Sequence, residues 1–384
     1  MTRIARNGPP FNILYLHETA KISGAENSLF NLVRGLDKST FKPFFVLPDE
    51  GPFAGELRNM GIEVDIVAMP PVRRLFGVAA AANQLQRLAK ERNIDLIHSN
   101  SIRTHFYASA ARRGKHIPVV WHQRNLITNE VIDPDRLFSF VPDKIVCNSD
   151  AVGRRFLSNG KLPPKVVVVH NGVDVRIFSP SADGKAVRQE FGIKDGEVVI
   201  GIASRFHKLM GHETFFGAAK MLLRDMPQQK IKFLVAGGAV FDPDMRRELE
   251  VKSMANDGQL KGAVIFTGFR KDMPQVYAAI DVLVLASSSE ACGRVVIEAM
   301  ASGKPVVGTK AGGTPELVED GVAGVLFPPG DVEALANALK RLINDGAKRQ
   351  AMGVAGRKRA EEMFSIEANV KKIQQVYAQL LEGR

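Results

Sequence analysis

Two glutamates in the stretch EACGRVVIE, Glu290 and Glu298, combine a residue type and a spacing that suit a ligand rich in hydroxyl groups. Glu290 follows the apolar run DVLVLASS, and Glu298 lies within the predicted helix that comes next. A carboxylate in the loop and another on the helix can each chelate vicinal hydroxyls, as a sugar and a ribose present them. The backbone amides of Gly293, Arg294 and Val295 would form the helix N-terminus, which attracts phosphate.

A structural interpretation of the same pair is also open. Glu290 can be a charge that stabilises the start of the helix, and Glu298 an exposed helical residue. Two glutamates alone favour this plainer interpretation. The choice depends on the elements that position the pair.

Short apolar runs alternate with helical patterns along the whole chain. In the first half, strands are predicted at 11–17, 41–48, 62–69, 94–100, 118–123, 144–149 and 166–170, with helices at 23–36, 52–60, 75–92, 103–113 and 150–159. In the second half, strands are predicted at 197–204, 232–238, 263–268, 281–288 and 305–309, with helices at 212–225, 243–256, 273–280, 294–303 and 331–344. Near-continuous apolar strands alternating with helices indicate parallel sheets covered on both faces.

The strand–helix pattern restarts after residue 180, and the polar segment SPSADGKAVR (179–188) between the halves is a plausible hinge. A chain of 384 residues is long enough for two domains, each with its own core. We therefore expect two doubly wound α/β domains, at 1–180 and 181–364, that face each other across a cleft. Ligands in such sheets bind at the carboxyl ends of the strands.

The composition, with 45% hydrophobic and 24% charged residues, is that of a soluble globular protein. The sequence shows no run long enough to span a bilayer and no export signal, so a cytoplasmic location is expected. Cys147 and Cys292 are predicted to be two unpaired thiols, and no Cys/His cluster has metal-site spacing.

The formal net charge of +11 is concentrated in the first half. Residues 1–180 hold 24 Lys and Arg against 16 Asp and Glu, a net of +8. Nucleic acid is not expected as a partner, because no aromatic-interleaved basic stretch or nucleic-acid motif is present. A phosphorylated acceptor, an anionic membrane surface and an ordinary solvated basic surface remain open.

Further motifs surround the glutamate pair. The second half carries FTGF (266–269), YAAIDVLVLAS (277–287), EAMASGKPVVGT (298–309), GGTPELVEDGVAGVLFPPGD (312–331) and EEMFS (361–365). The first half carries SGAE (23–26), VCNSDAV (146–152) and NGVDVRIFSP (171–180). Through these motifs nearly the whole chain resembles the retaining glycosyltransferases of family 4, which have the GT-B fold. The resemblance implies an acceptor-binding domain at 1–180, a nucleotide-sugar donor domain at 181–364, and a helix at 365–384 that crosses back to the first domain.

The resemblance implies roles for the residues of the donor domain. Glu298 would hold the ribose hydroxyls, and Glu290 would approach the hydroxyls of the transferred sugar. Glycines in the AGGTPE turn would let the backbone at Gly312, Gly313 and Thr314 approach the donor, although a turn that caps the next element is an equal alternative.

Arg205 matches a family arginine that clamps the diphosphate, but the family's lysine five residues later is replaced by Met210. Lys208 lies two residues earlier and is the substitute that the sequence offers. Fixed cations stabilise the charge that develops on a leaving diphosphate, and loss of one such group lowers the rate on the order of 100-fold. The departure at Met210 therefore places full catalytic competence in question.

In the first domain, the SGAE loop around Gly24 would lie near the donor phosphates, and a plain strand–helix turn is its alternative. His122, at the carboxyl end of the strand PVVWHQ, matches a family histidine that contacts the donor sugar. His98 and Asn100 end the preceding strand and are weaker candidates. The Asp-Pro-Asp stretches at 133–135 and 242–244 are predicted to be caps and turns, so no metal and no other cofactor is expected.

The implied reaction moves a hexosyl-type sugar from a nucleoside diphosphate, UDP rather than GDP, to an acceptor hydroxyl with retention at the anomeric carbon. The acceptor would be a sugar, in some relatives lipid-linked, which suits a role in cell-envelope, polysaccharide or glycolipid synthesis. Residues 71–92 begin with PVRRLFG and continue into an amphipathic helix that could rest on the inner face of a membrane, or pack as an ordinary helix. Two alternative functions remain: a nucleotide-sugar epimerase of similar fold, and a catalytically weakened paralogue that binds nucleotide-sugar without turnover.

Overall fold

The computed structural model describes residues 8–71, 73–112, 117–126, 133–238, 242–256 and 258–382. The chain divides into two compact units, one formed by Met1–Gly172 with Ile366–Arg384 and the other by Val173–Ser365. Each unit is described by itself.

The first unit is built on a seven-stranded sheet in the order β3-β2-β1-β4-β5-β6-β7. Every neighbouring pair of strands is parallel. The strands are β1 (Phe11–Leu16), β2 (Phe41–Leu47), β3 (Glu63–Ile66), β4 (Leu96–Ser99), β5 (Val119–Gln123), β6 (Lys144–Cys147) and β7 (Val166–Val168). The helices are α1 (Gly24–Gly35), α2 (Pro52–Asn59), α3 (Leu75–Glu91), α4 (Ile102–Ala111), α5 (Pro134–Leu137), α6 (Asp150–Gly153), the 3-10 turn η1 (Arg154–Phe156) and α15 (Ile366–Leu381).

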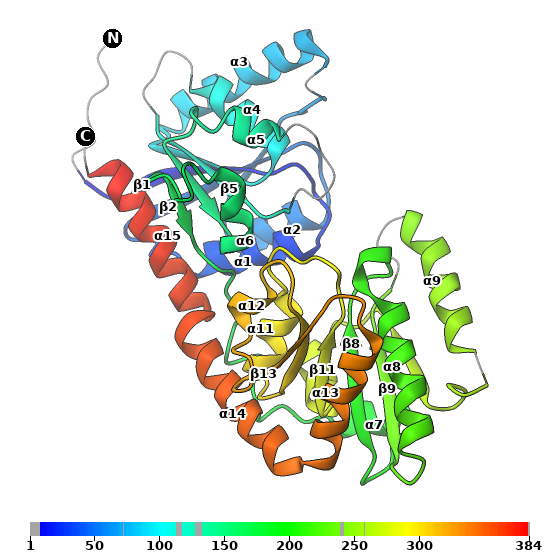
Figure 1. Cartoon of the computed structure of the whole chain (residues 1–384). Coiled ribbons are helices and arrows are strands. Elements are labelled where there is room, and N and C mark those ends of the chain that lie inside the picture. Colours follow the sequence, from blue (N-terminus) through cyan, green and yellow to red (C-terminus); the bar gives the residue numbers. More distant parts are fainter. Residues whose placement is uncertain are drawn as a thin grey trace. The chain divides into compact units, whose positions relative to one another are not determined.

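Helix α15, drawn in red in Figure 1, is part of the first unit although it ends the chain. Its apolar residues join those of α1, α2 and the strands in one buried core. A Cβ on Gly35 of α1 would lie 2.8 Å from Val370 and 2.9 Å from Ile366, so the absence of a side chain lets the two helices approach closely. The position of α15 is therefore fixed by packing against α1 and the sheet.

The second unit repeats the plan with six parallel strands in the order β10-β9-β8-β11-β12-β13. The strands are β8 (Val198–Ala203), β9 (Ile231–Ala236), β10 (Val264–Gly268), β11 (Val282–Leu285), β12 (Val306–Thr309) and β13 (Gly324–Phe327). The helices are α7 (Lys185–Glu190), η2 (Lys208–Met210), α8 (His212–Asp225), α9 (Asp242–Ala255), α10 (Met273–Ala279), α11 (Arg294–Ala301), α12 (Thr314–Leu317), α13 (Val332–Asn344) and α14 (Gly346–Met363).

Alternate residues of the strands in the second unit enter two separate cores. Ile200, Ile202 and Val284 pack with α8 and α13, whereas Val199 and Leu283 pack with α10 and α11. Because both faces are covered, the strands are apolar throughout, as a buried parallel sheet requires. The prediction of two doubly wound α/β domains is confirmed.

Helix α14 follows α13 and has no counterpart among the predicted helices. Its sequence, GAKRQAMGVAGRKRAEEM, lacks an apolar stripe, which explains why a periodicity argument misses it. It packs through small residues: a Cβ on Gly353 would lie 2.1 Å from the carbonyl oxygen of Gly303. Arg357 adds hydrogen bonds from its guanidinium to the carbonyl oxygens of Val175 and Phe178.

Other differences from the predicted elements are local. The predicted helix at 150–159 is the short α6 followed by η1, and the strand predicted at 62–69 is confined to Glu63–Ile66. The first unit ends at Gly172, ahead of the segment 179–188 that the sequence indicates as a hinge. Among the helices of the described ranges, none is long and apolar enough to cross a bilayer.

In both sheets the strand order reverses beside the first strand of the unit. This topological switch point lies between β1 and β4 in the first unit and between β8 and β11 in the second. Loops that follow these strands leave the sheet in a crevice where open α/β sheets bind ligands. The glutamate pair follows β11, directly at the second switch point.

Candidate functional site

The loops after β8 and β11 are joined at the carboxyl edge of the second sheet. Gly211 ends η2 with φ 71°, and a Cβ there would lie 2.0 Å from the carbonyl oxygen of Ala286. The amide of Ser288 donates to the carbonyl oxygen of Leu209 over 2.9 Å. Only glycine permits both this backbone conformation and this close approach. The segment that carries Arg205, Lys208 and Met210 is thus held against the loop that leads to Glu290.

Glu290 is held in turn by the AGGTPE loop that follows β12. The amide of Gly313 donates to the carbonyl oxygen of Glu290 over 2.8 Å. Gly312 has φ 55°, and a Cβ there would lie 2.1 Å from the same carbonyl oxygen, so only glycine fits this position. Burial raises the pKa of the Glu290 carboxyl, while the amides of Ala291 and Cys292 and the charge of Arg205 oppose the rise. The structure therefore brings Glu290, Arg205, Gly312 and Gly313 together.

Glu298 lies in α11, and both of its carboxylate oxygens accept hydrogen bonds. Its exposed fraction is 7%, Tyr277 donates to Oε2 over 2.9 Å, and Arg294 donates to Oε1 over 2.7 Å. The interpretation of Glu298 as an exposed helical residue is wrong. Each carboxylate oxygen accepts up to two hydrogen bonds, so each keeps capacity for a further donor such as a hydroxyl.

Tyr277 is a site residue to which the sequence analysis gave no role. It belongs to α10 and is 0% exposed, and burial, followed by the charge of Glu298, raises its pKa well above the ordinary value. A neutral hydroxyl that donates to a carboxylate fixes the orientation of that carboxylate. The motif YAAID contains Tyr277, but only the packing of α10 against α11 shows that the two side chains meet.

The α11 N-terminus lies between the two glutamates in the sequence. Gly293 is the residue before the helix, and the amides of Val296 and Ile297 already donate to its carbonyl oxygen. The amides of Gly293, Arg294 and Val295 precede the first of these bonds, as the first N–H groups of any helix do. Thr314, at the start of α12, is fully buried, and its Oγ1 has no hydrogen-bond partner within the ranges that the structure describes.

Met210 turns toward the sheet. Its sulfur accepts a hydrogen bond from the Ser287 hydroxyl over 3.7 Å, and the carbonyl oxygen of Ser287 accepts one from Thr309 over 2.7 Å. Lys208 and Arg205 are exposed. Lys208 and Met210 lie in the same 3-10 turn, so the charge expected at position 210 is present two residues earlier, on the solvent side of the turn.

In the first unit, the SGAE loop forms a buried polar group with His17, the residue that follows β1. Glu26 is hydrogen-bonded to His17 and accepts from the Ser23 amide over 2.7 Å. Burial opposes ionisation, but the His17 hydrogen bond and charge and the Ser23 hydroxyl lower the pKa of Glu26 from 4.5 to about 2. Gly24 starts α1, and a Cβ there would meet nothing within 4 Å. Gly24 is a predicted site residue of this loop, whereas no motif in the sequence indicates a role for His17.

His122 lies in β5 and is 2% exposed. Its Nδ1 lies 3.1 Å from Nε2 of His98 and 3.2 Å from a terminal guanidinium nitrogen of Arg124. His98, a weaker candidate by sequence, is also hydrogen-bonded to Tyr377 of α15. Asn100 accepts from Arg124 at 3.5 Å. These residues come from β4, β5 and α15 and from the loops beside them, so their positions in the sequence do not show that they meet.

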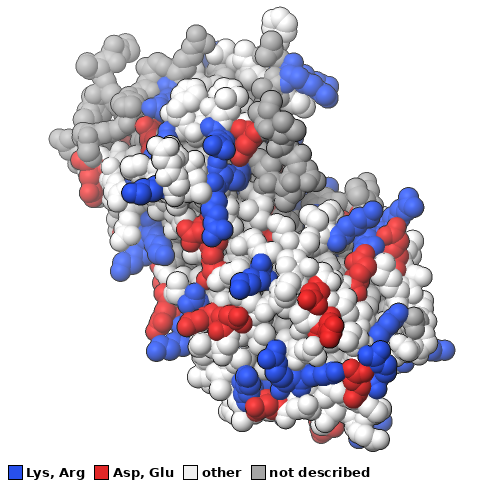
Figure 2. Space-filling view, viewed as in Figure 1, with Lys and Arg blue, Asp and Glu red and all other residues white. Residues whose placement is uncertain are grey.

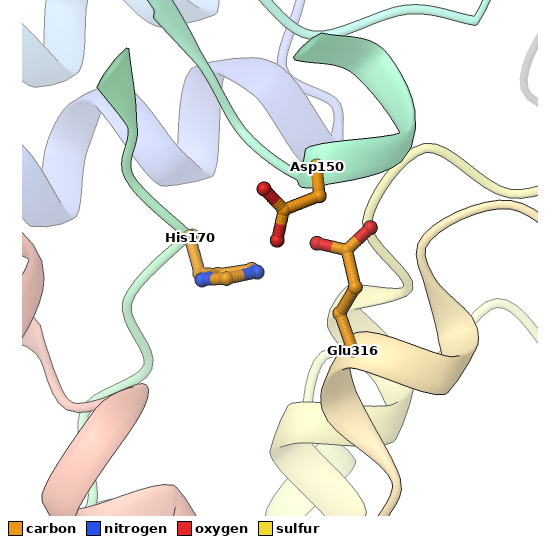
Figure 3. Close-up of side chains that lie close together, drawn as sticks. All are labelled: Asp150, His170 and Glu316. Carbon is orange, nitrogen blue, oxygen red and sulfur yellow. The ribbon is translucent and has the colours of Figure 1, made fainter. Parts of the chain in front are cut away.

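The first acidic stretch caps a helix as predicted, whereas Asp244 of the second lies inside α9, and its Oδ2 has no hydrogen-bond partner within the described ranges. Asp133 caps α5 by accepting from the amides of Asp135 and Arg136, and Arg155 donates to both aspartates. In the second stretch, the side chains of residues 242 and 243 lie outside the described residues. Figure 3 shows Asp150 of α6 and His170 after β7 with their polar ends directed toward each other, both in the first unit, whereas Glu316 belongs to α12 of the second.

Two family models match the chain. The model described as Glycosyltransferase Family 4 matches residues 22–177, and the model described as Glycosyl transferases group 1 matches residues 183–359. Each match falls within one half of the chain, and together they cover most of its length.

Among curated proteins, the D-inositol 3-phosphate glycosyltransferase of Corynebacterium kroppenstedtii is 31% identical over 240 residues, which is 61% of this chain and 53% of that protein. The sulfoquinovosyl transferase SQD2 of Arabidopsis thaliana is 30% identical over 226 residues, 57% of this chain and 41% of that protein. The chain thus matches about half the length of these curated relatives.

Among solved structures, HepE of Anabaena in complex with UDP and glucose is 28% identical with a TM-score of 0.83, over 96% of this chain and 100% of that one. The same protein has been crystallised with UDP-glucose. A glycosyltransferase of Rickettsia africae has a TM-score of 0.88 over 98% of this chain and 100% of its own, and at 20% identity it shows the fold alone.

Proposed function

Since this chain belongs to glycosyltransferase family 4 and has the GT-B fold, we propose that it transfers a hexosyl group from a UDP-sugar to an acceptor hydroxyl with retention of anomeric configuration. The observation that carries the proposal is the arrangement around α11. Two carboxylates, the half-buried Glu290 and the buried Glu298, flank a helix N-terminus at the switch point of a doubly wound sheet. A nucleotide sugar offers a hydroxyl pair at each end and a diphosphate between them.

In the proposed donor complex, Glu298 accepts hydrogen bonds from the two ribose hydroxyls. Tyr277 and Arg294 hold its carboxylate from behind, so little rotamer freedom is lost when the ribose binds. Glu290 accepts from hydroxyls of the sugar, and the backbone of Gly312 and Gly313 supports it. The amides of Gly293, Arg294 and Val295 receive the diphosphate at the start of α11.

The chemical step that we propose is a front-face substitution, in which the departing diphosphate takes up the acceptor proton as the new bond forms. Negative charge then grows on the diphosphate, and Arg205, Lys208 and the α11 N-terminus stabilise it without a metal. Arg205 also lies where its charge acts on Glu290. Activity that persists in EDTA and a product with the donor's anomeric configuration, seen by NMR, are the expected results.

UDP is preferred over GDP in the proposal because HepE, with 28% identity and nearly full coverage, was crystallised with UDP and with UDP-glucose. Ligands that bind only the folded state raise the melting temperature. A thermal-shift panel of UDP, GDP and ADP, with their glucose conjugates, should show the largest shift for the UDP compounds. Equal shifts for all three nucleotides would contradict a uridine preference.

Slow hydrolysis of UDP-glucose by the purified chain tests the enzyme itself. We expect UDP release above that of a Glu290→Gln variant, which keeps the shape of the side chain. Binding of UDP-glucose without hydrolysis or transfer would favour the second candidate, a weakened paralogue, which Met210 motivates. Release of an isomerised sugar nucleotide would favour an epimerase of the same fold.

The acceptor that we propose is a sugar or polyol hydroxyl on a cell-envelope, polysaccharide or glycolipid precursor in the cytoplasm. The name of one relative, a D-inositol 3-phosphate glycosyltransferase, includes a phosphorylated polyol. An anionic acceptor of that kind suits a first half with a net charge of +8. On the face drawn in Figure 2, Lys and Arg are interspersed with Asp and Glu over the second unit.

We further propose that the start of α3 touches an anionic membrane. Phe76 is 95% exposed, and Arg73 and Arg74 beside it are exposed as well. An exposed ring next to two cations suits the interface of an anionic bilayer. Liposome flotation should recover the chain with anionic but not neutral vesicles, and Phe76→Ser should weaken recovery, whereas Val354→Ser, at another exposed apolar residue in α14, should not. Equal recovery with both vesicle types would remove this part of the proposal.

A further inference from the structure

Three side chains of the first sheet lie on one face of neighbouring strands. The register pairs Tyr15 of β1 with His98 of β4, and His98 with Val120 of β5. Side chains of a strand alternate between faces, so His122 shares the face of Val120 and lies one step closer to the carboxyl edge. Tyr377 of α15, which packs on this face, contacts His98 and Tyr15. A continuous line of polar groups therefore runs from Tyr15 to His122 inside an otherwise apolar core.

The direction of every hydrogen bond in this line follows from Arg124. A guanidinium has donors and no acceptor, and it lies 3.2 Å from Nδ1 of His122. Nδ1 of His122 must therefore present its lone pair and carry no proton. Nε2 of His98, 3.1 Å from the same atom, must then be the N–H that donates to it.

The remaining bonds follow in sequence. A neutral imidazole has one proton, so His98 with a proton on Nε2 accepts at Nδ1, and the hydroxyl of Tyr377 donates there. The oxygen of Tyr377 then accepts from the hydroxyl of Tyr15 over 2.8 Å. Burial and the charge of Arg124 lower the pKa of His98 to about 3, in keeping with a neutral ring.

The line ends at Nε2 of His122. With Nδ1 bare, a neutral His122 carries its proton on Nε2, and this buried atom has no hydrogen-bond partner within the described parts of the chain. Burial first, and then the charge of Arg124, lower the pKa of His122 well below its ordinary value, which keeps the ring neutral. Buried donors are nearly always satisfied, and a ligand oxygen at the carboxyl edge of β5 would satisfy this one.

We propose that the chain Tyr15–Tyr377–His98 and the guanidinium of Arg124 lock His122 as the neutral imidazole protonated on Nε2, the state in which it can donate to the sugar that the family resemblance already places beside it. The sugar in this statement rests on the proposed function, whereas the tautomer does not. His122 is then a fixed donor and takes no proton from the acceptor, because its only basic nitrogen faces Arg124 and His98. Tyr377 and His98 are positioning residues, although Tyr377 belongs to the last helix of the chain.

Nitrogen-15 NMR of the ligand-free full chain, labelled at histidine, tests the tautomer without any activity. The signal of His122, assigned by its loss in His122→Gln, should show a protonated Nε2 and a bare Nδ1 at neutral pH. A proton on Nδ1, or on both nitrogens, would overturn the proposal. Absence of transferase activity with the expected spectrum would instead count against the proposed function alone.

The direction of the hydrogen bonds along this line allows a comparison of matched variants. Tyr377→Phe removes the donor that holds His98 in this tautomer and leaves Arg124 alone to set the line, so the His122 signal should split or shift. Tyr15→Phe removes an equally buried hydroxyl but leaves the Tyr377 donor in place, so the His122 signal should stay. His98→Gln keeps an N–H to donate to His122, whereas His98→Leu does not. Equal effects of Tyr15→Phe and Tyr377→Phe would contradict the direction of the line.

A sugar readout follows from UDP-glucose hydrolysis with a set of monodeoxy UDP-glucose donors. Loss of one neutral hydrogen bond lowers kcat/KM about tenfold. One deoxy donor should show this loss with the natural chain and none with His122→Leu, and Tyr377→Phe should give an intermediate result while Tyr15→Phe resembles the natural chain. If every deoxy donor loses as much kcat/KM with His122→Leu as with the natural chain, the bond from His122 to the sugar is absent and a water molecule satisfies His122.

Discussion

Replacement of Glu298 by alanine should weaken both the stability of the second unit and its affinity for UDP, whereas Glu298→Gln should weaken chiefly the affinity. Glu298 accepts from Tyr277 and Arg294 in the ligand-free chain. Alanine removes both acceptors. Glutamine keeps an oxygen for the Tyr277 hydroxyl, but it loses the charge and presents an NH2 group in place of the oxygen that accepts from Arg294.

The size of the stability effect follows from the Tyr277 hydroxyl, which is 0% exposed. A buried hydroxyl left without an acceptor costs about 1–3 kcal/mol, and the lost methylene adds about 0.8 kcal/mol. Glu298→Ala should therefore destabilise the second unit by about 2–4 kcal/mol, or about 10 °C in melting temperature for a unit of this size. The change from a charged to a neutral acceptor in Glu298→Gln should cost about 1 kcal/mol.

Affinity for UDP should fall in both variants, because each charged bond to a ribose hydroxyl contributes about 1.5–3 kcal/mol. We expect about 100-fold weaker binding for Glu298→Ala and about tenfold for Glu298→Gln. Calorimetric titration with UDP and thermal unfolding measure the two effects separately. A double variant, Tyr277→Phe with Glu298→Ala, has no orphaned hydroxyl, so it should regain most of the stability and none of the affinity.

The double variant tests whether the Tyr277 hydroxyl causes the loss of stability in Glu298→Ala. If Tyr277→Phe restores no stability to Glu298→Ala, the hydroxyl is not the source of the loss. If Glu298→Gln binds UDP as tightly as the natural chain, Glu298 does not hold the ribose, and the buried carboxylate serves only the packing of α10 against α11.

Three further outcomes follow from the site. Met210→Lys should raise UDP-glucose hydrolysis about tenfold or more by adding a cation at the diphosphate, with Met210→Leu unchanged; no gain would show that Lys208 and Arg205 already supply the charge. Gly312→Ala should lower UDP affinity, measured by titration, because its methyl would lie 2.1 Å from the Glu290 oxygen, whereas Gly321→Ala, also at positive φ but with nothing within 4 Å, should leave it intact. Glu26→Gln should reduce the acid sensitivity of the first unit: the folded pKa of about 2 is below the ordinary 4.5, so the ionised carboxylate stabilises the fold above about pH 4.5 and that stability is lost as pH falls toward 2. Urea unfolding at pH 7 and pH 3 measures this loss, and an unchanged difference in Glu26→Gln would contradict it.

Most strands and helices follow from local pattern, because buried parallel strands are apolar throughout and helices between them carry an apolar stripe. Helix α14 is the longest exception, and β13, α5 and α7 are shorter ones. The buried side of α14 is made of Gly353, Gly356 and Ala360, with Met352, and small residues give no periodic hydrophobic signal. Its place depends on the carbonyl oxygen of Gly303, which lies far away in the sequence and which only a residue without a side chain at position 353 can approach so closely.

The site divides in the same way. Glu290, Arg205, Gly312 and Gly313 were singled out from motifs, and the loops after β8, β11 and β12 bring them together. Tyr277 and Tyr377 were not given roles, because each is an apolar-core residue by its local pattern. Their hydroxyls matter because they contact Glu298 and His98, which belong to other elements of the fold.

The sequence by itself determined the two doubly wound units, the family, and the position of the glutamate pair after β11, since these depend on local periodicity and on motifs of neighbouring residues. Only the tertiary structure decided the states of the side chains. Whether Met210 faces Ser287, what orients the carboxylate of Glu298, and which nitrogen of His122 carries a proton depend on partners up to hundreds of residues away in the chain. Hydrogen-bond direction and burial are properties of the folded core, where the low dielectric makes each donor require its acceptor.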